Sequence, residues 1–402
     1  MWQKIKNVYH LLRAFTACIY FGFPSKKLTV IGVTGTDGKT TTSHMIYEIL
    51  KLAGKKVSLI SSIHAQIDEK LYDTGFHVTT PDPVALQKFL KKLVDSNSEY
   101  LVLEVTSHGL DQNRVFGIDF NFAVLTNITH EHLDYHMSFE NYLLVKARLF
   151  QGARVSILNL DDPSFSKIKK LANGKVITYS IDKKANFTSL NFPLKLKISG
   201  DYNLSNALCA AALATQTGIS KRIIIKALNN FQGVKGRMEE VDMGQDYQVI
   251  VDFAHTPNGL KQALKSLRSR GEDQGARIIA VFGAAGERDK LKRPKMGKIA
   301  AGYADICVLT AEDPRSERVE DICWQIAQGL VKSGKKEGSG FYKIYDRQKA
   351  IEFAVKLAKP GDIVVCFGKS HEKSMCFGKK EYPWDEFKTV EWLIAKKANE
   401  KE

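Results

Sequence analysis

Residues 28–50 read LTVIGVTGTDGKTTTSHMIYEIL, and this stretch decides the fold. The apolar, β-branched run at its start predicts a buried strand, and the amphipathic run at its end predicts a helix. Gly35 and Gly38 lie in the turn between them. Glycines there let successive backbone N–H groups converge on an anion at a helix N-terminus, where Lys39 adds a positive charge. This order predicts a nucleotide-phosphate site, with the Thr40 hydroxyl available to a phosphate-bound Mg²⁺.

Apolar runs of strand length recur along the chain in two series. The first series follows the glycine-rich loop and lies at residues 56–60, 100–105, 122–126 and 155–158. The second series lies at residues 247–253, 277–282, 305–310 and 362–367. Runs that are nearly continuous in hydrophobicity are typical of parallel strands covered on both faces. The sequence therefore predicts an α/β protein: a central P-loop-type domain with a mostly parallel sheet, followed by a smaller, Rossmann-like α/β C-terminal domain.

The boundary between these domains is expected where glycine and lysine replace the apolar pattern, just before residue 236. A chain of 402 residues is longer than one hydrophobic core usually serves, so more than one domain is expected. The predicted organisation is a short N-terminal helical segment at residues 1–27, a central domain at 28–235 and a C-terminal domain at 236–402.

The formal net charge of +15 suits nucleic acid, an anionic membrane surface or anionic small substrates as partners. No helix-turn-helix, RNP or zinc-finger pattern is present and the basic residues are spread along the chain, so no nucleic acid is expected to bind. Six cysteines are scattered without a C-x-x-C pair. They predict buried free thiols in a reducing cytoplasm rather than disulfides or zinc ligands.

An apolar, aromatic run at residues 9–23 follows two lysines near the start of the chain. Arg13 interrupts this run, and the run is shorter than the roughly 20 residues that a membrane-spanning helix needs. We interpret it as a helix that packs on the central domain. Peripheral membrane contact through residues 1–23 is the alternative.

Two ionisable residues occupy positions where a charge is costly. A helix capped by Ser138 would place Lys146 on its apolar face, where the side chain either reaches past the helix to solvent or enters a polar site. Glu104 ends a predicted buried strand, where its carboxylate needs a cation. A Mg²⁺ ion shared with ATP phosphates would meet that need, and a salt bridge to Arg114 or Lys39 is the alternative.

Four ordered motifs resemble the Mur ligase family, and within it the ligases that add the third amino acid of the peptidoglycan stem peptide. They are GTDGKTT at residues 35–41, TTP at 79–81, EVTSHGLDQNR at 104–114 and NITHEHLDYH at 127–136. The resemblance implies an ATP-dependent acid–amino-acid ligase of peptidoglycan precursor synthesis, and hence of cell wall biogenesis, cell shape and division. Such a ligase forms an acyl phosphate from ATP and the acceptor carboxylate, which the incoming amino group attacks.

The resemblance assigns the ATP site and implies two Mg²⁺ sites. The ATP-binding positions are Gly35, Thr36, Asp37, Gly38, Lys39, Thr40, Thr41, Asn206, Arg237 and Asp252. Asp37 stands where the family usually has asparagine. The implied Mg²⁺ ligands are Thr40, Glu104, His132 and Lys146, the last as N6-carboxylysine formed with CO₂. The implied catalytic residues are Lys39, Glu104, His132 and Lys146.

The resemblance also implies two substrate pockets. The positions for a muramoyl-peptide acceptor are Thr79, Thr80, Thr106, Ser107, Gln112 and Arg114. The positions for the added amino acid are Arg288, Glu312, Asp313, Pro314, Arg315, Gly368 and Glu372. Arg315 favours meso-diaminopimelate, because a guanidinium can grip its distal carboxylate through two parallel hydrogen bonds. Asp313 is an anion at a position where the family usually has asparagine. An anion there could repel a carboxylate and attract an amine, so lysine is the alternative diamino acid.

The region ahead of the ATP loop departs from the family. A separate UDP-binding domain usually precedes this loop, whereas here the first predicted strand begins at residue 28. We therefore expect that UDP is held differently, that a partner supplies this domain, or that the acceptor is not a UDP-sugar peptide. A Mur-type ligase acting on a different, non-UDP carboxylate, as in folylpolyglutamate-forming relatives, is the first alternative function. A nucleotide-dependent nucleic-acid-binding protein is the second.

Overall fold

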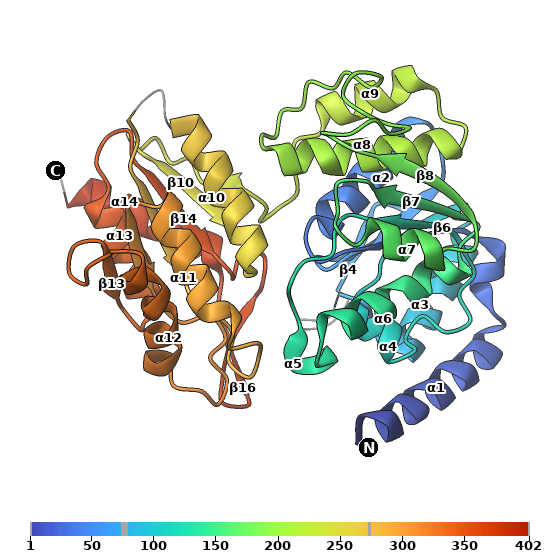
Figure 1. Ribbon diagram of the computed structural model, residues 1–402, viewed down its shortest axis with the longest axis horizontal. Coiled ribbons are helices and arrows are strands. Elements are labelled where there is room, and N and C mark those ends of the chain that lie inside the picture. The colour runs from blue at the N-terminus through green and yellow to red at the C-terminus, as the bar shows by residue number, and fades with distance from the viewer. Residues whose placement is uncertain (1, 74–78, 272–274, 401–402) are drawn as a thin grey trace. The chain divides into compact units, whose positions relative to one another are not determined.

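The computed structural model describes residues 2–73, 79–271 and 275–400. The chain divides into two compact units, Met1–Gln232 and Gly233–Glu402, each with a central sheet between helices (Figure 1). The predicted fold class is confirmed, since a mostly parallel sheet is followed by a second α/β unit.

The first unit is built on an eight-stranded sheet with the order β4-β3-β2-β5-β1-β6-β7-β8. Its strands are β1 (Thr29–Thr34), β2 (Val57–Ile60), β3 (Ala65–Ile67), β4 (Lys70–Tyr72), β5 (Tyr100–Glu104), β6 (Phe120–Leu125), β7 (Val155–Asn159) and β8 (Lys175–Tyr179). All neighbours from β2 to β8 in this order pair in parallel, whereas β3 and β4 are antiparallel strands at one side of the sheet. Val33 on β1 pairs with Glu104 on β5 and with Val124 on β6, so the loops after these strands leave the same edge.

Helices cover both faces of this sheet (Figure 1). They are α1 (Trp2–Phe21), α2 (Lys39–Leu52), α3 (Pro83–Asp95), α4 (Ser107–Asp111), α5 (Leu133–His136), α6 (Phe139–Gly152), α7 (Phe165–Leu171), α8 (Asp201–Gln216) and α9 (Lys221–Asn230), with a 3₁₀ turn η1 (Pro24–Lys27). Helices α2, α8 and α9 pack together on one face, and apolar residues of α3, α6 and α7 share a core with the other. Ser138 caps α6 as predicted, because its hydroxyl accepts a hydrogen bond from the Asn141 amide at 3.1 Å.

The second unit contains a six-stranded sheet with the order β13-β12-β11-β14-β10-β9. Its strands are β9 (Glu239–Glu240), β10 (Gln248–Asp252), β11 (Ile278–Phe282), β12 (Ile306–Leu309), β13 (Phe341–Lys343) and β14 (Ile363–Phe367), and β15 (Ser374–Phe377) and β16 (Lys380–Pro383) form a separate hairpin. Its helices are α10 (Pro257–Gly271), α11 (Lys292–Tyr303), α12 (Val319–Lys332), α13 (Arg347–Leu357) and α14 (Glu386–Asn399).

Successive side chains of these strands point into two separate cores, which explains their continuous hydrophobicity. On β14, Ile363, Val365 and Phe367 pack with α10, α11 and α12. Val364 and Cys366, between them, pack with α13 and α14. All six cysteines of the chain are buried and free, as predicted. Among the described helices, none is both long and apolar enough to cross a membrane.

Candidate active site

The loop between β1 and α2 is held from the side by residues that follow β6. The Thr126 hydroxyl donates a hydrogen bond to the Asp37 carbonyl at 2.6 Å, and the Asn127 side chain accepts one from the Asp37 amide at 3.0 Å. A Cβ atom on Gly35 would lie 1.8 Å from the Thr126 hydroxyl, so only glycine fits there. These contacts fix the backbone of the loop, as a phosphate-binding loop requires.

Asn206 from α8 reaches the same loop. Gly38, immediately before α2, has a φ of 80°, a conformation that favours glycine. A Cβ atom on Gly38 would lie 2.5 Å from the Asn206 side-chain oxygen. Asn206, which is distant in sequence, is therefore brought together with the predicted ATP loop.

Two lysines converge on the carbonyl of Gly35. Lys39 Nζ donates a hydrogen bond to this oxygen at 3.0 Å, and Lys146 Nζ donates one at 2.8 Å. Lys146 is 1% exposed and has a second contact, to the Thr34 hydroxyl at 3.4 Å. Lys146 therefore enters a polar site and does not reach solvent, which decides between the two alternatives left by the sequence.

The surroundings of Lys146 favour its neutral form. Burial, together with the nearby Lys39 charge, holds the pKa of Lys146 well below its usual value. Among the described residues, no carboxylate forms an ion pair with Lys146, and the charge of Asp37, which acts to raise its pKa, does not outweigh burial and Lys39. The side chain thus places a buried amine beside the loop.

Thr40 and Glu104 supply oxygen donors on two adjacent elements, since Thr40 lies in the first turn of α2 and Glu104 ends β5. Thr40 is 4% exposed and its hydroxyl pairs with that of Ser62 at 3.0 Å, while Glu104 is fully buried. Hydroxyl and carboxylate oxygens suit Mg²⁺, which usually takes its remaining ligands from substrate phosphates and water. In the part of the chain that the structure describes, no group of three or more His, Cys, Asp or Glu side chains could hold a metal by itself. The donor set therefore fits a Mg²⁺ ion whose shell is completed by ATP phosphates.

Histidine and tyrosine rings gather beside α6. The ring of His132 lies 4.9 Å from that of His108 and 6.2 Å from that of Tyr142, measured between centroids. Burial lowers the pKa of His136, in the same cluster, to about 4, so this ring is neutral at physiological pH. The Tyr142 hydroxyl pairs with the Thr36 hydroxyl at 2.9 Å, which joins the cluster to the predicted ATP loop.

Tyr142 was not predicted as a site residue. It lies one helical turn before Lys146, and both side chains are buried on the same side of α6. That spacing is the signal in the sequence that could have identified it.

Four of the six predicted acceptor-binding residues, Thr80, Thr106, Gln112 and Arg114, form one hydrogen-bonded network. The Thr80 hydroxyl donates to the Glu104 carbonyl at 3.1 Å and accepts from the Thr106 amide at 3.0 Å. Arg114 donates to the Thr80 carbonyl at 2.7 Å and to the Gln112 side-chain oxygen at 3.0 Å and 2.7 Å. The network lies at the end of β5 and the start of α4. Two further predicted positions adjoin it in the chain, Thr79 and Ser107.

In the second unit, two positions with an implied role in ATP binding lie around the end of β10. The Asp252 carboxylate accepts hydrogen bonds from the Met238 and Ala254 amides, both at 2.8 Å, and burial raises its pKa. The Arg237 guanidinium lies over the Phe253 ring, 4.5 Å from its centroid. Arg237 and Asp252 are thus brought together within this unit.

The loops that follow β11, β12 and β14 converge on the predicted amino-acid pocket. A Cβ atom on Gly286 would lie 1.8 Å from the Pro314 carbonyl, and one on Gly368 would lie 2.3 Å from a carboxylate oxygen of Glu312. Arg315 donates a hydrogen bond to the Gly286 carbonyl at 3.1 Å. The structure therefore gathers these predicted residues at one edge of the second sheet. Arg288 follows Gly286 on the same loop.

Lys369 connects two members of this pocket and was not predicted. Its side chain is fully buried, and its Nζ atom lies 2.8 Å from the Asp313 carboxylate and 2.7 Å from the Glu372 carboxylate. Burial alone would lower the pKa of Lys369, but Glu372 and Asp313 outweigh it and hold the pKa above its usual value. Lys369 lies between two predicted pocket residues, Gly368 and Glu372, in the sequence. That position could have identified it as a further member of the pocket.

A buried ion pair supports the same pocket. Arg347 on α13 pairs with Glu386 on α14 at 2.5 Å, and both side chains are at most 1% exposed. Arg347 also donates to the carbonyls of Ala311 at 3.1 Å and Phe367 at 2.7 Å. These residues directly precede Glu312 and Gly368 in the chain, and burial raises the pKa of Glu312 to about 7.

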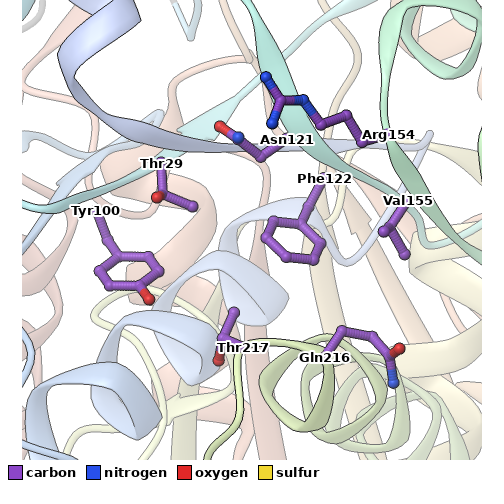
Figure 2. A pocket seen from close by; sticks show the side chains of 8 residues that line it. All are labelled: Thr29, Tyr100, Asn121, Phe122, Arg154, Val155, Gln216 and Thr217. Atoms are coloured by element: carbon purple, nitrogen blue, oxygen red, sulfur yellow. The ribbon is translucent and has the colours of Figure 1, made fainter.

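A separate cavity of about 370 Å³ opens at the opposite edge of the first sheet, where several strands begin (Figure 2). It is lined by Thr29, Tyr100, Asn121, Phe122, Arg154, Val155, Gln216 and Thr217. None of the predicted site residues lines it.

Sequence models of two family domains match the chain. The Mur ligase middle domain matches residues 33–214, and the Mur ligase, glutamate ligase domain matches residues 236–370. The chain belongs to the Mur ligase family. The predicted family and the predicted enzyme class, an ATP-dependent amide ligase, are thereby confirmed.

Relatives and solved structures agree with this Mur ligase assignment. A UDP-N-acetylmuramoyl-L-alanyl-D-glutamate–2,6-diaminopimelate ligase from Syntrophomonas wolfei is 39% identical over 95% of this chain and 81% of its own length. A solved ligase of the same name is 31% identical, with a TM-score of 0.59 over 92% of this chain and 79% of its own. A folylpolyglutamate synthase from Mycobacterium tuberculosis, solved with ADP and AMPPCP, shares the fold: it is 16% identical, with a TM-score of 0.70 over 90% of this chain and 93% of its own.

Proposed function

We propose that this Mur ligase joins meso-diaminopimelate to UDP-N-acetylmuramoyl-L-alanyl-D-glutamate, with ATP converted to ADP and phosphate, in cytoplasmic peptidoglycan precursor synthesis. The 39% identity to a ligase of that name supports the choice of substrates. The observation that carries the proposal is the convergence of Lys39 and the buried Lys146 amine on the Gly35 carbonyl.

The proposed reaction has two steps. A carboxylate oxygen of the acceptor attacks the γ-phosphorus of ATP, the bond to ADP breaks, and an acyl phosphate forms. The amino group of the added residue then attacks the acyl carbon, loses a proton and expels phosphate, which leaves an amide. The first step brings a carboxylate and the ATP phosphates together, and Lys39 with the N-terminus of α2 would offset their negative charge. Thr40, Glu104 and His132 would hold Mg²⁺, which supplies further positive charge to the phosphates.

We propose that Lys146 carries a carbamate. A neutral amine can attack CO₂, forming a nitrogen–carbon bond and releasing one proton, whereas a protonated lysine cannot. The lowered pKa of Lys146 supports this step. The product has a negative charge and two oxygens in place of the amine, so it could serve a second Mg²⁺ ion.

The pocket in the second unit supports diaminopimelate over lysine as the added residue. Arg315 offers a guanidinium for the distal carboxylate. The charge of Asp313, which motivated the lysine alternative, is offset by Lys369 at 2.8 Å. An offset carboxylate repels a second carboxylate less than an isolated one does.

Phosphate release tests the proposal. The full chain is incubated with ATP, Mg²⁺ and UDP-muramoyl dipeptide, and diaminopimelate and lysine are compared. We expect phosphate release that requires the acceptor and is faster with diaminopimelate than with lysine. Parallel reactions with the muramoyl dipeptide lacking UDP, and with folylglutamate, test the non-UDP alternative. No release with any UDP-linked acceptor would contradict the proposed substrate.

A further inference from the structure

Helix α1 exposes a stripe of large apolar side chains along its length. Val8, Leu12, Phe15 and Ile19 are spaced three or four residues apart and are between 47% and 59% exposed. Residues at this spacing share one face of a helix. Tyr9 and Tyr20 widen the stripe, at 59% and 84% exposed.

The other face of α1 is attached to the first unit through small residues. Ala14, Ala17 and Cys18 are buried, and the Cys18 thiol donates to the Phe116 carbonyl at 3.3 Å. The Asn7 side chain donates to the Asp111 carboxylate at 3.0 Å. The helix is therefore held in place with its large apolar side chains directed outward.

The segment that carries this stripe has charges of one sign. Residues 1–36 contain no aspartate or glutamate, and they contain Lys4, Lys6, Arg13, Lys26 and Lys27, of which Arg13 pairs with Asp82 at 3.6 Å. Lys26 and Lys27 are exposed just beyond the end of α1. A second copy of this helix would bring like charges together, whereas an anionic lipid surface complements them.

We propose that α1 docks on an anionic membrane surface and lies in its plane, with the apolar stripe at the boundary between headgroups and acyl chains. Aromatic and aliphatic residues on one face, with flanking lysines, are what such interfacial helices use. Docking of α1 would hold the enzyme at the membrane surface whichever acceptor and amino acid it joins.

Vesicle co-sedimentation of the full chain tests the proposal, using phosphatidylcholine vesicles with and without phosphatidylglycerol. We expect binding only to vesicles that contain phosphatidylglycerol, weakened by salt. The double variant Leu12→Glu/Phe15→Glu should bind at least about tenfold more weakly. The matched control Leu190→Glu/Trp324→Glu changes two side chains that are 93% and 58% exposed elsewhere, and it should bind as the wild type does.

Two results would overturn the proposal. One is equal vesicle binding by Leu12→Glu/Phe15→Glu and the wild type. The other is that the wild type binds neither kind of vesicle. If light scattering then shows that the wild type is a dimer and that the double variant is a monomer, the stripe is the contact surface for a second copy of the chain. Circular dichroism checks that both variants remain folded.

Discussion

Lys146 in the first unit and Lys369 in the second are both fully buried, yet their surroundings shift their pKa values in opposite directions. Lys146 contacts a carbonyl and a hydroxyl, and its pKa is held well below the usual value. Lys369 contacts two carboxylates, and its pKa is held above the usual value. Burial lowers the pKa of both lysines, and carboxylate partners reverse the direction of the shift only at Lys369.

The largest expected effect is on catalysis at Lys146. Lys146→Met removes the amine but keeps an apolar side chain of similar length, so we expect ligase activity to fall by about a thousandfold or more. Stability should stay equal or rise, because no buried amine remains. Phosphate release and urea unfolding measure the two effects. Lys167→Met, at a lysine that is 57% exposed, is the control and should retain activity.

Lys369→Met should instead destabilise the protein. It leaves the buried Asp313 and the partly buried Glu372 without the charge of Lys369, and breaking a buried pair costs about 3–5 kcal/mol. The KM for the added amino acid should rise as well. Lys373→Met removes an exposed lysine paired with Asp385 and should cost less than about 1 kcal/mol. Equal unfolding midpoints for Lys369→Met and Lys373→Met would show that the buried lysine contributes no more to stability than the exposed one.

Glu312 should make stability depend on pH. Its folded pKa of about 7 lies above the ordinary value of 4.5, so its contribution is fully present below pH 4.5 and is lost as pH rises through 7. Ionisation of Glu312 should lower the free energy of unfolding by about 3 kcal/mol. The free energy of unfolding of Glu312→Gln, relative to that of the wild type, should therefore increase as the pH rises from 5 to 8. Urea titrations at each pH measure this difference. A constant difference across this range would show that the carboxylate is not so perturbed.

The smallest expected effect is on amino-acid choice. Arg315→Lys keeps the charge but loses the two-pronged guanidinium, so the preference for diaminopimelate over lysine should fall by about tenfold. Competition between the two amino acids measures this preference. An unchanged preference would remove Arg315 from the specificity pocket.

The sequence predicted the central strands of both sheets, because buried parallel strands leave a continuous apolar pattern, as in β5 and β14, but it did not predict the strands toward the edges, such as β4 and β13. It also identified Lys146 as anomalous, since helical spacing places it among apolar side chains. It could not identify the partners of Lys146 or Lys369, because these are set by contacts between residues far apart in the chain. Gly35 and Lys146, which are 111 positions apart, are an example.

The most direct test of the central claim is carbon-13 NMR of the protein in labelled bicarbonate. If Lys146 is a neutral amine that takes up CO₂, the wild type and Lys369→Met should show a carbamate resonance that Lys146→Met lacks. A wild type without this resonance, or a resonance that persists in Lys146→Met, would contradict the account.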